Sequence, residues 1–219
     1  MKNIIIHVPH SSLYIPEEYI KTALIPQDEL EIENNFMCDT GIVDLIPLAF
    51  IENTLIFPYS RLYCDVERLI DGTEPMEAYG MGYIYTKDSF GRDMFKYDTE
   101  HMHKINKIYD DHHKKLDQRV KEILETHGEC IIIDLHSFSD ETVDRLFGYK
   151  DCPDVCIGVE KDYYSEELVT AIKNLCKVMG LTVQIDYPYK GSIVPNAYYG
   201  KKDTGIISLM IEINKRILK

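Results

Sequence analysis

Residues 130–135 read CIIIDL and are the clearest indication of the fold. A short run of β-branched apolar residues bounded by polar ones is typical of a strand buried inside a sheet. Comparable runs recur at residues 3–8, 53–57, 154–159, 182–186 and 206–213. Helical patterns stand between them, at residues 27–34, 39–49, 98–127 and 165–178. Strands that alternate with helices predict a three-layer α/β/α fold around a mixed, mostly parallel sheet.

The chain of 219 residues is expected to form one domain over residues 1–219 with a substantial core. Its longest stretch without periodicity is residues 72–97, which are rich in Tyr and Gly. Long irregular segments of compact domains are often lids or binding loops, so we expect an active-site loop insertion there. The alternative is a peripheral hairpin that packs on its own tyrosines.

The charge balance is acidic, with 24 Lys and Arg against 37 Asp and Glu and a net charge of −13. This charge repels phosphate backbones and anionic lipids, which argues against nucleic acid and membranes as partners. The six cysteines show no paired spacing, so we expect reduced, structural thiols. The first residues, MKNIIIHVPH, hold too short an apolar run for a signal peptide or a membrane span, which predicts a cytoplasmic protein.

Three polar residues lie where the expected strands end or run through apolar sequence. His10 follows the strand at 3–8, His136 follows CIIIDL, and Glu212 lies inside the run IISLMIEI. Ligands collect at the carboxyl ends of strands in α/β sheets, so these positions favour a functional role. Two histidines and a carboxylate are the raw material of a hydrolytic zinc site, in which Glu212 would be the general base.

Each of these residues also has a structural interpretation. A lone histidine near a strand end is more often hydrogen-bonded than metal-bound, and Glu212 could pair with Lys215 or Arg216. His136 is the stronger ligand candidate, because Asp134 lies two residues away on the same face of the strand and could orient it. Among the other histidines, His7 is a secondary ligand candidate. Four more are expected to be surface residues of the long helix: His101, His103, His112 and His113.

Two segments carry cationic side chains after strands. SRLYCDVERLID, residues 60–71, sets Arg61 and Arg68 around two acids. Such arginines form either a surface ion-pair network or a fork for a substrate carboxylate. DYPYKGS, residues 186–192, suits a tight loop that presents Lys190 and backbone amides to an anion, although a plain turn has the same pattern.

Five motifs are spread over nearly the whole chain: VPHSS at 8–12, SRLYCDVER at 60–68, IDLHS at 133–137, YPYKGS at 187–192 and MIEINKR at 210–216. Together these motifs resemble the N-formylglutamate amidohydrolase family. The family is similar in fold to zinc carboxypeptidases and aspartoacylase-like deacylases, which implies a phosphorylase/hydrolase-like domain. The resemblance also implies zinc-dependent hydrolysis of an N-formyl amino acid, typically formylglutamate in histidine breakdown, to formate and the free amino acid.

The resemblance assigns the metal-binding roles residue by residue. His10 and His136 are expected to bind zinc. Asp39 is the expected third, acidic ligand, with Glu33 as the alternative. Glu212 matches the base, which would take a proton from the attacking water and return it to the leaving amine.

The substrate roles follow in the same way. Arg61 and Arg68 are expected to hold the carboxylate of a small acyl amino acid, and Arg61 is also expected to stabilise the oxyanion. The substrate side further includes Ser137, Tyr189, Lys190 and Gly191. The chain departs from the family pattern at Glu67, where an acid replaces an amide, and at both ends of the loop, Asp186 and Ser192. An added negative charge near the carboxylate fork would weaken binding of a dicarboxylate.

Alternative functions therefore stay open. The same site could act on another N-acyl amino acid or on a small peptide. The pocket could also bind a small anion without chemistry. A thiol enzyme that uses Cys64 or Cys130 is the remaining alternative.

Overall fold

The computed structural model describes residues 2–218, which divide into two compact units. Unit 1 comprises residues 2–8, 41–56 and 115–218, and unit 2 comprises residues 9–40 and 57–114. The long helix α3 (Thr99–His127) gives its first half to unit 2 and its second half to unit 1. A single amidohydrolase domain over the whole chain stays a prediction. Within residues 2–218, no helix has the length and apolar character needed to cross a membrane.

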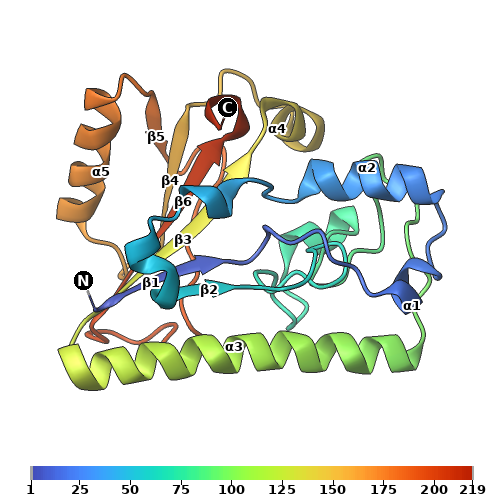
Figure 1. Ribbon diagram of the computed structural model, residues 1–219, viewed down its shortest axis with the longest axis horizontal. Coiled ribbons are helices and arrows are strands. Elements are labelled where there is room, and N and C mark those ends of the chain that lie inside the picture. The colour runs from blue at the N-terminus through green and yellow to red at the C-terminus, as the bar shows by residue number, and fades with distance from the viewer. Residues whose placement is uncertain (1, 219) are drawn as a thin grey trace. The chain divides into compact units, whose positions relative to one another are not determined.

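Unit 1 is built on a six-stranded sheet of order β2-β1-β3-β6-β4-β5 (Figure 1). The strands are β1 (Ile4–Val8), β2 (Thr54–Ile56), β3 (Cys130–Phe138), β4 (Val155–Val159), β5 (Val183–Ile185) and β6 (Ile206–Asn214). Neighbouring strands are parallel except β4 and β6, which pair antiparallel. The predicted mixed, mostly parallel sheet is confirmed, and each of the expected apolar runs forms a strand.

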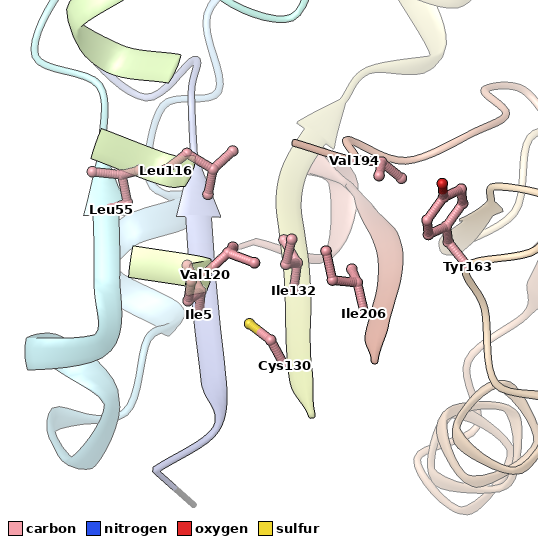
Figure 2. Packing of buried hydrophobic residues seen from close by; sticks show 9 residues of the cluster. All are labelled: Ile5, Leu55, Leu116, Val120, Cys130, Ile132, Tyr163, Val194 and Ile206. Carbon is pink, nitrogen blue, oxygen red and sulfur yellow. The ribbon is translucent and has the colours of Figure 1, made fainter. Parts of the chain in front are cut away.

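Helices cover both faces of this sheet. On one face, Leu116 and Val120 of α3 pack over β1 and β3, in the cluster drawn in Figure 2. On the other face, the 3₁₀ helix η1 (Ile42–Leu45) packs over β1 and β3, and α5 (Glu166–Val178) packs over β4 and β6. This is the predicted three-layer α/β/α arrangement.

Two local expectations differ from the structure. The helix expected at 39–49 is instead η1 followed by a second 3₁₀ helix, η2 (Leu48–Asn53), because Pro47 interrupts the helical hydrogen bonds. The helix α4 (Asp140–Phe147) was not expected. The Ser139 side chain caps its start by accepting a hydrogen bond from the Thr142 N–H, and Gly148 ends it in the left-handed conformation. A final 3₁₀ helix, η4 (Lys215–Ile217), follows β6.

Strand β3 continues to Phe138, so His136 lies within the strand rather than after it. Side chains alternate along a strand, which places His136 and Asp134 on the same face. The registers pair His7 with Asp134 and His136 with Glu212. These four polar residues therefore share the sheet face that α3 covers further down the strands.

Unit 2 holds the helices α1 (Glu17–Ile20), α2 (Gln27–Met37), η3 (Pro75–Tyr79) and the first half of α3. Its core is aromatic, since the buried ring of Tyr19 packs against Tyr63 and Phe95 at centroid distances of 4.7 and 4.5 Å. The segment 72–97 is largely irregular, as expected. It is fastened to α2, because Ser89 donates hydrogen bonds from its N–H and Oγ to Glu33 at 2.7 and 2.8 Å.

Two histidines of α3 correct the expectation of a plain surface helix. His112 is buried, with its ring centroid 5.0 Å from that of Phe57. The Nε2 atom of His113 donates to the Val66 carbonyl at 2.8 Å. The surface assignment was therefore wrong for His112, because this part of the helix faces the interior of unit 2.

Candidate active site

In unit 1, the buried carboxylate of Asp134 organises the polar residues of β1 and β3. Its Oδ1 accepts a hydrogen bond from His7 Nδ1 at 2.8 Å and lies 3.2 Å from His136 Nε2. Burial raises the pKa of Asp134, but His136 and His7 together hold it well below its usual range. An ionised carboxylate beside two imidazoles suits a group that orients a metal-binding histidine.

Glu212 lies beside this group, directly across from His136 on the neighbouring strand β6. Glu212 is 7% exposed, and on the other neighbouring strand, β4, it pairs with Cys156. Arg216 was one possible ion-pair partner of Glu212. In the structure it donates a hydrogen bond to Asp154 at 2.8 Å. A buried carboxylate next to a candidate metal ligand is the arrangement that a general base requires.

The loop that follows β5 crosses the same face of the sheet. The Ile193 N–H donates to Asp134 Oδ2 at 3.3 Å. A Cβ atom added to Gly158 would lie only 2.2 Å from the Gly191 carbonyl oxygen, so this close crossing requires glycine on β4. The predicted substrate segment 189–191 is thereby anchored to β3 and β4.

In unit 2, His10 lies between two buried carboxylates. Its Nε2 donates to Asp65 Oδ1 at 2.8 Å, and its Nδ1 lies 3.8 Å from Asp39 Oδ2. The Asp39 N–H also donates to the His10 carbonyl at 2.8 Å, which keeps the two residues adjacent. Burial and the nearby Arg61 lower the pKa of His10, which favours the neutral imidazole, the form that can ligate a metal.

The two arginines predicted to bind a carboxylate both face Asp65. Nε and Nη2 of Arg61 donate to Asp65 Oδ2 at 3.1 and 2.8 Å, and Arg68 Nε lies 3.7 Å from the same oxygen. Burial raises the pKa of Asp65, but His10, Arg61 and Arg68 hold it well below its usual range. Glu67 brings a further carboxylate, with Oε2 3.7 Å from His10 Nε2.

Asp65 is the residue of this group whose importance was not evident from the sequence. The two flanking arginines were a visible signal of a buried or substrate-binding acid. Its hydrogen-bond partner His10, however, is 55 positions away in the chain. Only the fold brings these two residues together.

Two other predicted site residues lie elsewhere. Ser137 follows His136 in β3, so strand alternation turns it to the opposite face of the sheet, which does not support a substrate contact from that face. Glu33, the alternative acidic ligand, binds Ser89. Asp39 is therefore the better supported carboxylate beside His10.

The cysteines do not resemble catalytic thiols. All six are free and buried in the described chain. Burial and the neighbouring Asp65 raise the pKa of Cys64 well above its usual range, and burial and Glu129 raise that of Cys130 to about 12. A nucleophilic cysteine needs a lowered pKa, so these values argue against a thiol enzyme.

The segment 72–97 lines most of a cavity of about 390 Å³ within unit 2. The lining residues are Glu77, Gly80, Gly82, Tyr83, Ile84, Thr86, Tyr97 and Met102. None of the predicted site residues is among them. A role of this segment as an active-site cover stays a prediction.

Buried histidines and aspartates of the kind that can hold a metal ion occur in each unit, namely His7, Asp134 and His136 in unit 1 and His10 and Asp39 in unit 2. Imidazole nitrogens and carboxylate oxygens are the donors that suit a hydrolytic zinc ion. Each of the two predicted ligand histidines also has an aspartate at its Nε2, namely Asp65 for His10 and Asp134 for His136. Metal-bound histidines usually have such a carboxylate, so the residues fit the expected ion.

Known proteins resemble this chain in sequence and in fold. A family model described as N-formylglutamate amidohydrolase matches residues 2–218. The solved N-formylglutamate amidohydrolase from Ralstonia eutropha JMP134 is similar over 98% of this chain and 82% of its own, with a TM-score of 0.80 and 21% identity. A gene product of Agrobacterium tumefaciens is similar over 99% of this chain and 82% of its own, with a TM-score of 0.71 and 18% identity. No curated protein gives a significant sequence match.

Proposed function

The chain belongs to the N-formylglutamate amidohydrolase family, and we propose that it hydrolyses N-formyl-L-glutamate to formate and L-glutamate. The observation that carries this proposal is the pairing of His136 with Glu212 on neighbouring strands of the sheet. This pairing sets a buried carboxylate beside a histidine suited to hold a metal ion. The amide bond of the substrate would be cleaved at this place.

We propose zinc as the metal, with His10, Asp39 and His136 as its ligands. The parallel pairing of β1 with β3, the strand of His136, supports this set. His10 follows the last residue of β1 by two positions. His10 thus follows the carboxyl end of β1, and strand ends of this kind carry the ligand-binding residues of α/β sheets. When bound, zinc supplies a Lewis acid and lowers the pKa of a water molecule there.

Glu212 is the proposed general base and acid. Its carboxylate takes the proton from the attacking water and then gives it to the nitrogen of the leaving amino acid. Its position supports this role, since it is buried and lies across from His136 on the neighbouring strand.

The substrate carboxylates are proposed to meet cationic groups and backbone amides. Arg68 is the arginine with the more exposed side chain, at 24% against 13% for Arg61. Lys190 is exposed on the anchored loop, and the Gly191 backbone beside it lies against β4. These groups can neutralise a small acidic substrate in spite of the net negative charge of the chain.

A second substrate class is favoured by Glu67. Its carboxylate lies 3.7 Å from His10 Nε2 and adds negative charge beside the proposed metal ligand. A substrate with a neutral side chain avoids this repulsion. The second candidate function is therefore hydrolysis of another N-acyl amino acid.

The test is formate release from N-formyl-L-glutamate by the zinc-loaded protein and by Glu212→Gln. The variant should lose about 10²–10⁴-fold in kcat while its fold and zinc content stay unchanged, because only the proton acceptor is removed. The control is Glu129→Gln, which removes the same charge at the opposite end of β3 and should keep full activity. Wild-type turnover of other N-acyl amino acids, without turnover of N-formyl-L-glutamate, would select the second function. Near-normal activity of Glu212→Gln would reject the assignment of the base.

A further inference from the structure

We propose that Asp65 is a positioning residue that fixes the His10 ring for metal binding, and that Arg61 acts by holding Asp65 rather than by binding substrate. The inference rests on the proposed metal site. Arg61 and Arg68, which the sequence predicts to bind the substrate carboxylate together, thereby receive different roles. Every residue that carries it belongs to unit 2.

The first step is the number of donors that converge on Asp65. Its side chain is fully buried, and Oδ1 accepts from His10 Nε2 at 2.8 Å and from the Glu67 N–H at 3.1 Å. Oδ2 accepts from two nitrogens of Arg61 and lies 3.4 Å from the Tyr85 hydroxyl, which also donates to it. A carboxylate held on both oxygens has little rotational freedom, so it imposes one orientation on its histidine.

The second step concerns Arg61. Its Nε and Nη2 are engaged by Asp65, and its Nη1 donates to the Met37 carbonyl at 3.4 Å. Its guanidinium also lies 5.9 Å from the centre of the Tyr85 ring. All three nitrogens of this guanidinium therefore have protein partners, an arrangement suited to holding Asp65 and poorly suited to receiving a substrate carboxylate.

The third step is the direction that this imposes on His10. Because Nε2 donates to Asp65, the ring presents Nδ1 for coordination. Nδ1 is also the nitrogen that lies 3.8 Å from Asp39 Oδ2, the other proposed ligand of this unit. Arg61 thus fixes Asp65, and Asp65 in turn orients His10 so that its Nδ1 is available to the metal.

Arg68 has different contacts. Its Nε lies 3.7 Å from Asp65 Oδ2, beyond hydrogen-bond distance. Its backbone is fixed by the Tyr109 hydroxyl, which donates to the Arg68 carbonyl at 2.8 Å. A fixed backbone with a side chain that is partly exposed suits a group that binds substrate.

The test compares zinc affinity, KM and thermal stability in four variants of the full-length protein. Zinc affinity of the apoprotein is measured by competition with a chromophoric chelator. Asp65→Asn should weaken zinc binding by about 10–100-fold, the usual effect of losing the carboxylate behind a ligand histidine. Arg61→Gln should weaken zinc binding in the same direction and leave KM for N-formyl-L-glutamate close to the wild-type value.

The other two variants separate positioning from general destabilisation. Asp88→Asn is the matched control, because Asp88 is a buried acid of the same unit that pairs with Arg92 four residues later, as Asp65 is paired by Arg61. It should lower the melting temperature without changing zinc affinity. Arg68→Gln should keep zinc affinity and raise KM by about tenfold or more, since the substrate carboxylate loses a charged hydrogen-bond donor of the protein.

The outcomes distinguish this inference from the proposed function. Zinc affinity of Asp65→Asn equal to that of the wild type and of Asp88→Asn would overturn the inference while the hydrolase function stands. If the wild type binds zinc but releases no formate, the proposed function fails, and a loss of zinc affinity in Asp65→Asn still supports the inference. Should Asp65→Asn fail to fold, Arg61→Gln decides: a raised KM with unchanged zinc affinity would overturn the positioning role.

Discussion

At the scale of single residues, Gly158 lies where a loop crosses the sheet without room for a side chain. An added Cβ would meet the Gly191 carbonyl oxygen at 2.2 Å and the Met210 side chain at 2.4 Å. Gly158→Ala should therefore displace the loop and lower the free energy of unfolding by about 1–3 kcal/mol. It should also raise KM, because the segment 189–191 moves with the loop. Urea unfolding and steady-state kinetics measure the two effects.

The control for this prediction is Gly82→Ala. Its added Cβ would meet Glu77 Cγ at 2.7 Å, an atom of a flexible side chain that can move aside. This variant should be much closer to the wild type in stability. Equal stability of Gly158→Ala and the wild type would show that the loop does not rest on β4 in this way.

The sequence identified single residues when they contrasted with their neighbours. Glu212 stands out in an apolar run, and the structure buries it beside His136. Asp65 stands in a segment full of charges, so no local contrast marked it as buried. Its contact with His10 depends on the folding of unit 2 and leaves no trace in the spacing of residues.

At the scale of elements, Asp154 joins the ends of three strands. Asp154 directly precedes β4. Its Oδ2 accepts hydrogen bonds from the N–H and Oγ1 of Thr182, the residue before β5, at 2.8 and 2.7 Å. Its Oδ1 accepts a hydrogen bond from Arg216, which follows β6, at 2.8 Å. The hydrogen bonds from Thr182, assisted by Arg216, lower the pKa of Asp154 to about 2. Asp154→Asn should reduce the free energy of unfolding by about 1–2 kcal/mol at pH 7.

The pH dependence of this effect has a defined sign. The pKa is lower in the folded chain than the reference value of 3.8, so the ionised group stabilises the fold above about pH 4. This contribution is lost as the pH falls toward 2, because the carboxylate takes up a proton. The difference between wild type and Asp154→Asn should therefore shrink from pH 5 to pH 2 in urea unfolding. A difference that stays constant over this range would refute the assigned role of Asp154.

The elements themselves were largely predictable, and the exceptions have physical causes. The apolar runs predicted every strand of the sheet because buried strands need continuous apolar sequence. The end of β3 was placed too early, since Asp134 and His136 interrupt the apolar run although backbone pairing with β6 continues to Phe138. Helix α4 was not predicted, because its eight residues form too few turns to show a helical repeat of apolar residues.

At the scale of the whole molecule, His136 and Glu212 belong to the sheet-based unit, and His10 and Asp39 belong to the second unit. The family relationship covers both, since the match runs over residues 2–218. The order of the motifs predicted this membership, and the strand pattern predicted the fold. The partner of His10, a proposed metal ligand, came from the structure alone, because Asp65 lies 55 positions away in the chain.

Zinc bound to this chain is proposed to enable amide hydrolysis, and a zinc titration of the apoprotein tests this proposal. Formate release from N-formyl-L-glutamate is measured after each addition of zinc. The rate should rise in proportion to zinc, level off at one equivalent per chain and fall to background when a chelator removes the ion. Full formate release by the metal-free protein, unchanged by zinc or chelator, would contradict the claim.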